Sequence, residues 1–286
     1  MRKSILFLIL LFSFFVMCQN NNKKEEAINV FSSDTIPMQY NSRRLPILDG
    51  IVNDSLHFKV FFDTGTWDSN FYISDSFKNL FFHDSAFVQI GKFKKQMSGI
   101  YYYGSTERSF SDIFGKNTIL VGWKFFENKI IEFDFQNQRI LVYEELPDIT
   151  EYSKTKIILS RNSVGNSALL IPAQIVLQGK TIKDTFNIDT GCNVYMVLSA
   201  KHIREQGIDT INAHYGKSTV GGGHMPAFFI PADTIKIGGL YTANQNMRIT
   251  FSDYNGIGLL GTITMQNFSV ILDLINFDFY LKKINN

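Results

Sequence analysis

The tripeptide Asp-Thr-Gly occurs twice in this 286-residue chain, as Asp63-Thr64-Gly65 and as Asp189-Thr190-Gly191. Each copy ends a run of mostly apolar residues. Two carboxyl groups within hydrogen-bonding distance cannot both ionise readily, so they share a proton. The ionised group can then activate a water while its protonated partner polarises a carbonyl. This chemistry is general acid–base hydrolysis of an amide without a covalent intermediate.

The residues that follow each aspartate suit a tight loop that meets a twin. Glycine adopts backbone conformations that are closed to other residues, so Gly65 and Gly191 allow a sharp turn after a strand. Thr64 and Thr190 each supply a hydroxyl that can bind one loop to the other. We expect the two loops to face each other across a pseudo-twofold axis, which would bring the two aspartates together.

A β-hairpin is expected before each loop, because short apolar runs flank turn-forming residues there. The turns are Asn53-Asp54-Ser55 in the first half and Gln178-Gly179-Lys180 in the second. A further strand and a helix N-cap follow each loop, with Ser74 or Asp75 as the first cap and Ser199 as the second. The hairpin strands are expected at residues 45–53, 56–62, 168–177 and 181–188.

The repeat continues towards the end of each half. Leu120-Val121-Gly122 is matched by Leu259-Leu260-Gly261, and Asp134 and Asp273 follow the two glycines at the same spacing. Both acids lie in strand-like runs, so a turn or capping role is expected for them rather than catalysis. Self-similarity of this extent predicts two copies of one module, with a boundary within residues 144–154.

Composition narrows the choice of partners. The chain is 45% hydrophobic and rich in Phe and Tyr, which favours β-structure. The net charge of +2 gives no field that favours nucleic acid, so no nucleic-acid partner is expected. The five histidines show no paired spacing typical of metal ligands, and we expect neither a metal nor another cofactor.

These motifs resemble those of aspartic proteases of the retropepsin and pepsin type, over roughly residues 45–281. In each lobe of that family, apolar residues precede Asp-Thr/Ser-Gly, and two apolar residues and a glycine follow later. The resemblance implies a mainly β, bilobal aspartic-protease fold, with two homologous β-barrel-like lobes and a central cleft. It implies that Asp63 and Asp189 are the catalytic pair, that Thr64 and Thr190 interlock, and that the substrate is a peptide or protein. Both motifs lie in one chain, so a monomer suffices.

The sequence departs from the family after each glycine, where Ser or Ala is common. Thr66 and Cys192 stand there instead. A hydroxyl can stabilise a neighbouring carboxylate, whereas a thiol donates weakly. We therefore expect Asp63 to be the more ionised partner and Asp189 the usual proton carrier. Cys192 is expected to fill a gap as a small buried residue rather than to act as a nucleophile.

Enzymes of this family hold substrate under a mobile hairpin, the flap. Residues 98–105, with Tyr101 and Tyr102, are the candidate in the first half, and an ordinary strand with aromatic packing is the alternative. Residues 220–224, with Gly222, are the candidate in the second half, where a mobile surface loop is the alternative.

The N-terminus is typical of an export signal. Residues 1–17 carry a basic start and an apolar run that is short for a membrane span, and Cys18 follows directly. This arrangement resembles the lipobox of bacterial lipoproteins, although Met17 stands where a small residue is usual. We expect export to the bacterial cell envelope with a lipid on Cys18. An uncleaved anchor and a simple secretory signal are the alternatives.

The expected organisation is a signal peptide (1–17), a flexible polar tether (18–39), an N-terminal lobe (40–147) and a C-terminal lobe (148–286). The expected function is that of an aspartic endopeptidase. The first alternative is a catalytically silent lipoprotein that binds a peptide or other ligand on the same fold. A purely structural surface lipoprotein is the second alternative, and in that case the repeated motif is incidental.

Overall fold

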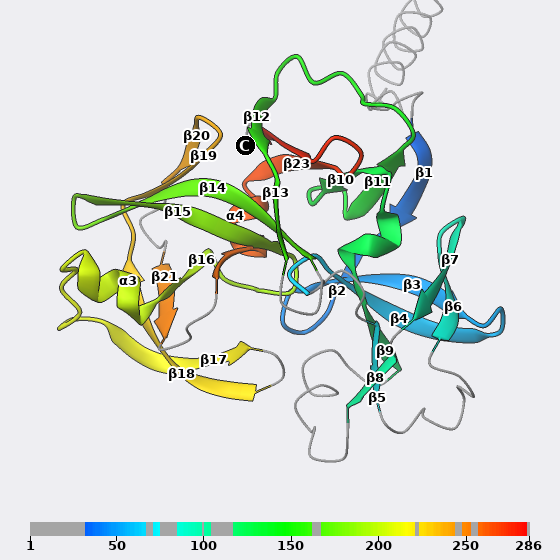
Figure 1. Cartoon of the computed structure of the whole chain (residues 1–286), viewed down its shortest axis with the longest axis horizontal. Coiled ribbons are helices and arrows are strands. Elements are labelled where there is room, and N and C mark those ends of the chain that lie inside the picture. Colours follow the sequence, from blue (N-terminus) through cyan, green and yellow to red (C-terminus); the bar gives the residue numbers. More distant parts are fainter. Residues whose placement is uncertain are drawn as a thin grey trace, which may run out of the picture.

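The computed structural model describes residues 32–66, 71–74, 85–98, 100–103, 117–161, 167–220, 223–243, 248–252 and 257–284. These residues form a mainly β structure with a few short helical turns, as the composition predicted (Figure 1). The strands belong to three sheets. One sheet lies in each half of the chain, and the third is shared between the halves.

The sheet of the N-terminal half has the order β7-β6-β3-β4-β9-β5-β8, with β2 paired to β3. The hairpin β3–β4 is its centre, and its turn residues Asn53 and Asp54 have positive φ angles of 49° and 63°. A 3-10 turn, η2 (Trp123–Phe126), follows β9. The strands are β2 (Gln39–Tyr40), β3 (Pro46–Val52), β4 (Leu56–Asp63), β5 (Phe71–Ser74), β6 (Ser85–Ile90), β7 (Phe93–Ser98), β8 (Ile100–Tyr103) and β9 (Thr118–Gly122).

The sheet of the C-terminal half has the order β17-β18-β21-β16-β22-β15-β14-β19-β20, with β13 paired to β14. Ser199 caps helix α3 (Ala200–Glu205) by accepting the N–H of His202, as the sequence predicted, and α4 (Thr262–Met265) follows β22. The strands are β13 (Ile158–Arg161), β14 (Ser167–Leu177), β15 (Lys180–Asp189), β16 (Met196–Ser199), β17 (His214–Val220), β18 (Gly223–Pro231), β19 (Thr234–Ile237), β20 (Leu240–Thr242), β21 (Arg248–Ser252) and β22 (Gly258–Gly261).

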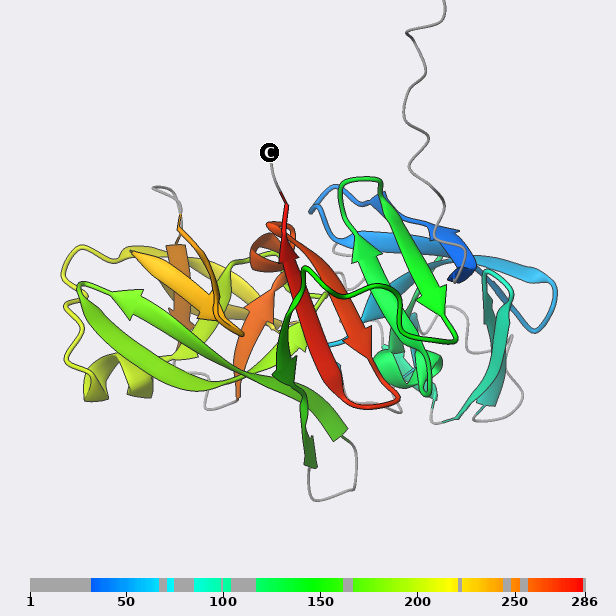
Figure 2. The ribbon, with the colours of Figure 1, turned by 90° about the horizontal axis from the view of Figure 1, so that it is seen from above.

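The third sheet joins the two halves and lies across the middle of the molecule (Figure 2). Its order is β1-β11-β10-β23-β24-β12, so the central pair β10–β23 brings together one strand from each half. The strands are β1 (Ser32–Pro37), β10 (Ile130–Asp134), β11 (Arg139–Tyr143), β12 (Ser153–Lys156), β23 (Phe268–Asp273) and β24 (Asp278–Lys283).

The central pair carries the internal symmetry that the sequence repeat predicted. Glu132 and Ile271 are equivalent residues of the two halves, and they lie opposite each other in the antiparallel register. Ile131 faces Leu272, and their equivalents in the other halves, Val270 and Phe133, also face each other. A local pseudo-twofold axis therefore passes between Glu132 and Ile271.

The two Asp-Thr-Gly loops are held by equivalent strand pairings in the two halves. Strand β4 pairs in parallel with β9, which places Asp63 beside Gly122. Strand β15 pairs in parallel with β22, which places Asp189 beside Gly261. Each aspartate thus lies at the end of a central strand, beside the glycine of the second repeated motif.

Asp134 and Asp273 serve turns, as expected. The side chain of Asp134 accepts the N–H of Asn137 at 3.1 Å, and that of Asp273 accepts the N–H of Asn276 at 2.8 Å. These bonds hold the hairpins β10–β11 and β23–β24.

The expected tether of residues 18–39 needs a correction, because β1 and the start of β2 lie within it. Strand β1 pairs with β11, with Ile36 opposite Ile140, and the side chains of Ile36 and Met38 are buried. These two apolar side chains complete the core beneath the shared sheet, so folded structure begins no later than Ser32. The signal peptide and Cys18 lie outside the described residues.

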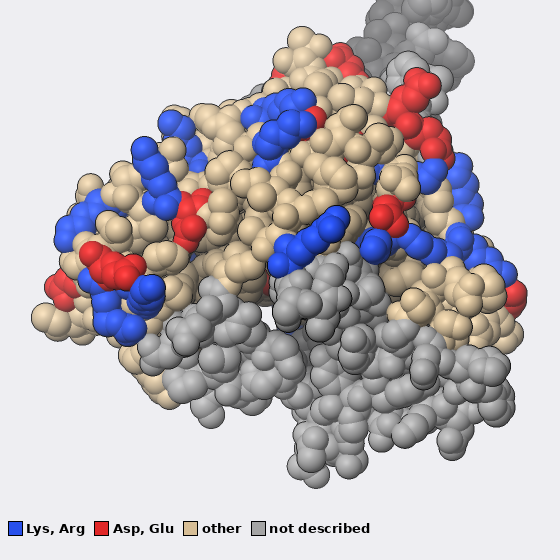
Figure 3. Space-filling model, viewed as in Figure 1, with Lys and Arg blue, Asp and Glu red and all other residues tan. Residues whose placement is uncertain are grey.

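One hydrophobic core runs through both halves and includes residues from all three sheets. At the boundary, buried Trp123 donates its indole N–H to the carbonyl of Ser167 in the other half at 3.0 Å. No helix within the described residues is long and apolar enough to span a membrane. On the face in Figure 3, basic side chains lie in separate groups with acidic side chains between them.

Candidate active site

The two Asp-Thr-Gly loops interlock through their threonines, both of which are fully buried. The Thr64 hydroxyl accepts the N–H of Thr190 at 3.1 Å and donates to the carbonyl of Ile188 at 2.8 Å. The Thr190 hydroxyl accepts the N–H of Thr64 at 2.9 Å and donates to the carbonyl of Phe62 at 2.7 Å. Each hydroxyl therefore satisfies one donor and one acceptor of the opposite loop, and the loops are held in a twofold arrangement.

The glycines of the loops are required by close packing. A Cβ atom on Gly191 would lie 2.7 Å from Oδ2 and 2.8 Å from Cγ of Asp63, and one on Gly65 would collide with the carboxyl group of Asp189. Neither glycine is among the described residues with positive φ, so the expectation that they supply unusual backbone conformations is wrong. Each carboxyl group instead packs directly on the glycine of the other loop.

The two carboxyl groups are hydrogen-bonded to each other and have different surroundings. The pKa of Asp63 is raised, because burial outweighs the N–H groups of Gly65, Thr66 and Gly191 and the carboxyl of Asp189, which act in the opposite direction. The N–H of Gly65 donates to its Oδ1 at 2.8 Å. These donors stabilise the ionised form of Asp63.

Asp189 has fewer such donors. Burial, followed by the negative charge of Asp63, raises its pKa well above the ordinary value, and the N–H of Gly191 at 2.8 Å opposes this shift. The pair therefore favours a single proton held on the Asp189 side. As whole residues, both aspartates are only partly buried.

The direction of this asymmetry is the one expected from the sequence, but its physical cause differs. The sequence argument assigned it to the Thr66 hydroxyl. In the structure, the group of Thr66 that lowers the pKa of Asp63 is its backbone N–H. A backbone donor is independent of the side chain, so it is a cause of the asymmetry that the sequence argument did not consider.

Cys192 lies beside the pair as a free, partly buried thiol. Burial raises its pKa well above the ordinary value, and the charges of Asp189 and Asp63 raise it further. The thiolate is the nucleophilic form of cysteine, and it is disfavoured here. This agrees with the expected role of a small residue that fills space.

The two flap candidates have different positions. The backbone of Tyr101 and Tyr102 lies in β8, which pairs in parallel with β5, just as β21 pairs in parallel with β16 in the other half. This favours the alternative of an ordinary strand for that segment. In the C-terminal half, β17 and β18 do form a hairpin, and the end at which β17 finishes and β18 begins points towards the N-terminal half in Figure 1. Gly222, expected near the tip of this hairpin, lies outside the described residues.

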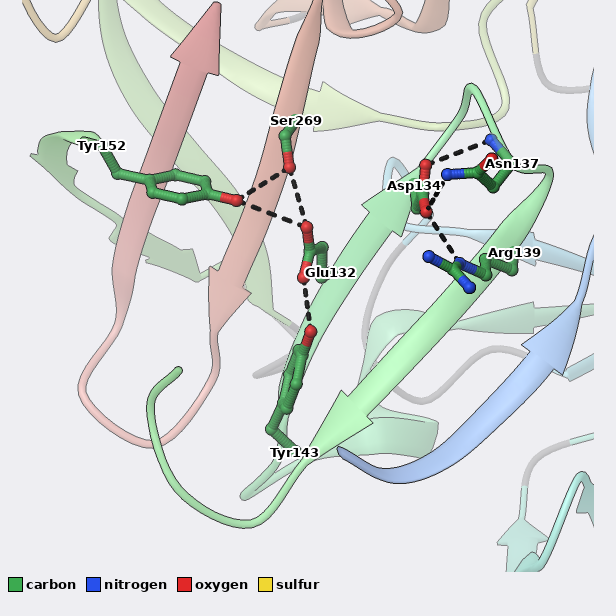
Figure 4. A network of polar contacts seen from close by, with 7 residues as sticks. All are labelled: Glu132, Asp134, Asn137, Arg139, Tyr143, Tyr152 and Ser269. Carbon is green, nitrogen blue, oxygen red and sulfur yellow. Dashed lines mark hydrogen bonds and ion pairs between the residues drawn. The ribbon is translucent and has the colours of Figure 1, made fainter. Parts of the chain in front are cut away.

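A second polar cluster lies on the shared sheet, around β10, β11 and β23 (Figure 4). Glu132 accepts the hydroxyl of Tyr143 at 2.5 Å, that of Ser269 at 2.8 Å and that of Tyr152 at 3.3 Å. Burial, followed by the charge of Glu132, raises the pKa of Tyr152 to about 12, so its hydroxyl remains a donor. Next to it, Asp134 pairs with Arg139 at 2.7 Å.

These groups border a cavity of about 700 Å³, and neither Asp63 nor Asp189 lines it. Each hydroxyl of the cluster already has a carboxylate partner, and the contacts tie strands of the two halves together. A structural link between the halves is the simplest account of the cluster.

Asn187 is a residue of the site that sequence reasoning missed. It stands two residues before Asp189, is buried, and donates its amide to the carbonyl of Gly65 across the two loops at 2.8 Å. Its equivalent in the first half is the apolar Phe61. A polar residue in the apolar run before one motif, but not before the other, was the available signal.

Within the described residues, no three His, Cys, Asp or Glu side chains lie close enough to hold a metal ion. No family model matches the chain, and no curated protein matches it. Any assignment of function therefore depends on the geometry of the two loops.

Proposed function

We propose that the chain is an aspartic endopeptidase, with Asp63 and Asp189 as its catalytic pair. The observation that carries the proposal is the contact of two carboxyl groups from equivalent, interlocked loops with unequal hydrogen-bond donors. A pair that holds one proton has a base and an acid side by side, which the hydrolysis of an amide by water requires. The two halves would then be the lobes of a bilobal aspartic-protease fold.

In this mechanism, the ionised Asp63 takes a proton from a water held between the carboxyl groups. Asp189 donates a hydrogen bond and then its proton to the carbonyl oxygen of the scissile peptide. Attack of the water gives a tetrahedral intermediate. Proton transfer to the amide nitrogen, with return of a proton to the pair, releases the two products and restores the starting state. No covalent bond to the protein forms.

The substrate is a peptide or protein, and the enzyme acts as a monomer because both loops belong to one chain. The cell envelope is the proposed location, with a lipid on Cys18 and the following polar residues as a tether. The folded part begins by Ser32, so the tether is shorter than the sequence suggested.

Cleavage of a mixed peptide library from acidic to neutral pH tests the proposal. Protein that starts near residue 20 is compared with its Asp63→Asn and Asp189→Asn variants, and each substitution should reduce the rate by about 10³-fold or more because it removes the base or the acid. Asp49→Asn is the matched control, since Asp49 is exposed and, among the described residues, forms a surface ion pair with Lys59.

Cleavage that survives substitution of both aspartates would contradict the assignment. Saturable binding of peptides by the wild-type protein without any cleavage would instead favour the alternative of a silent binding lipoprotein.

A further inference from the structure

The apolar runs before the two aspartates differ at one equivalent position. Phe61 stands two residues before Asp63, and Asn187 stands two residues before Asp189. Both side chains are buried, at 0% and 6% relative exposure. An amide in the place of a phenyl ring is therefore a break in an otherwise close pseudo-twofold arrangement.

The amide of Asn187 acts on the loop of the other half. Its Nδ2 donates to the carbonyl oxygen of Gly65 at 2.8 Å. That oxygen shares a peptide plane with the N–H of Thr66, and in a trans peptide the two groups point in opposite directions. Holding the carbonyl on Asn187 thus directs the N–H of Thr66 to the opposite side of the plane, where it interacts with the Asp63 carboxylate.

The equivalent peptide of the other loop is used differently. It joins Gly191 and Cys192, and the N–H of Cys192 bonds to the backbone carbonyl of Asp189 at 3.3 Å instead of to a carboxylate. Phe61, at the position equivalent to Asn187, has no group that could hold the carbonyl of Gly191. The additional donor is therefore present on one side of the pair alone.

We propose that Asn187 is a positioning residue that orients the Gly65–Thr66 peptide towards Asp63, and so decides which carboxyl of the pair keeps the shared proton. The inference rests on the proposed function for its catalytic consequence, but not for its effect on the proton. Among the described residues, the titratable groups that act on one another here are Asp63, Asp189 and Cys192.

A second observation indicates that Asn187 is not there for stability. Its Oδ1 is buried without a hydrogen-bond partner in the described structure. An unsatisfied buried acceptor destabilises a fold, and an apolar side chain of similar size removes that cost. Asn187→Leu removes the unpaired Oδ1 but also the donor to the carbonyl of Gly65, so these effects oppose each other and the melting temperature is expected to stay near that of the wild type.

In the test, the full chain carries ¹³C at Cγ of its aspartates, and NMR follows these carboxyl signals as the pH is changed. The signals of the pair are assigned with Asp63→Asn and Asp189→Asn. In the wild type, Asp63 should lose its proton in the first step. In Asn187→Leu, the midpoint of that step should rise by about 0.5–1 pH unit, because the orientation of a charge-assisted donor is lost. Phe61→Leu is the matched control and should not move it.

Asn187→Val gives a second variant in case the leucine does not fit. A first step that stays at the wild-type midpoint in a folded Asn187 variant would overturn the inference, as would an equal shift in Phe61→Leu. The acidic limb of the pH–rate profile should move in the same direction where cleavage is measured. If no peptide is cleaved, the proposed function fails while the titration still decides the role of Asn187.

Discussion

At the scale of single residues, Asp63 and Asp189 show how equivalent positions become chemically unequal. The same three residue types form both loops, yet backbone N–H groups from Gly65, Thr66 and Gly191 act on Asp63, whereas Gly191 alone acts on Asp189 in this way. Hydrogen bonds to a carboxylate favour its charged form, and burial without them favours the neutral form. Two roles can thus arise from one repeated motif.

The raised pKa of Asp189 predicts a specific dependence of stability on pH. A carboxyl whose folded pKa lies above its unfolded value binds more protons in the native state between those two values, so stability falls as pH rises through this window. Asp189→Asn removes this contribution. We expect thermal denaturation from about pH 4 to pH 7 to show a flatter profile for the variant than for the wild type. A wild type that gains stability relative to the variant over that range would contradict the assignment.

The packing of each glycine on the opposite carboxyl group predicts the effect of one added methyl group. Gly191→Ala should displace the carboxyl of Asp63, reduce cleavage by about 10²-fold or more and destabilise the fold by about 1–3 kcal/mol. Gly179→Ala is the control, since its Cβ would meet nothing within 4 Å, although its φ is +72°. It should cost about 1 kcal/mol through its backbone and leave cleavage unchanged. Equal loss of activity in both variants would count against the packing argument.

At the scale of elements, the loops are held from two sides. Parallel pairing with β9 and β22 anchors the strand that precedes each aspartate, and the threonine interlock anchors the residue that follows it. Fixing a carboxyl at both ends of a short loop leaves its position little freedom. This rigidity is what a pair of reacting groups requires.

The interlock predicts strong coupling between the two threonines. Thr64→Val leaves the N–H of Thr190 and the carbonyl of Ile188 without their partner, so it should destabilise the fold by about 2–4 kcal/mol in chemical denaturation. Thr190→Val should behave alike, and the double variant should lose less than the sum. Thr250→Val is the matched control. Its hydroxyl is buried without a partner in the described structure, so this change should be neutral or stabilising. Additive effects at the two loop positions would refute the coupling.

At the scale of the molecule, the two halves depend on each other. The shared sheet joins three strands of each half through the central pair β10–β23, and one core runs through both halves. Glu132 and Trp123 form hydrogen bonds across the boundary. The local twofold symmetry of β10–β23 is that of a two-chain interface contained within one chain. Asp63 and Asp189 come together only when the halves are docked.

This dependence predicts the behaviour of a divided chain. Two fragments separated within residues 145–149, between β11 and β12, should co-purify when expressed together, because the β10–β23 pairing and the common core do not need the connection. Each fragment alone should aggregate or remain unfolded, since it exposes the edge of a central strand. Tagged co-purification and circular dichroism measure this. Two stable, independent fragments would contradict it.

Local sequence determined much of the fold. Turn residues between apolar runs marked the hairpins β3–β4 and β14–β15, Ser199 marked the start of α3, and Asp134 and Asp273 marked turns. These features depend on neighbours along the chain, so propensity and spacing are sufficient for them. The repeat also implied a symmetric pairing of the two loops, because two copies of one module have equivalent surfaces to offer each other.

Other features depended on contacts between residues distant in the chain, and these only the tertiary structure decided. Strand β1 lies in a stretch that resembled a tether, because its few apolar residues gain their burial from β11 and from a core built of residues distant in the sequence. The need for glycine came from the carboxyl group of the other half rather than from the backbone. The unequal donors around the aspartates, and the contact of Asn187 with Gly65, arise where the halves meet. No local pattern encodes which peptide N–H faces a carboxylate, because that orientation is set by docking.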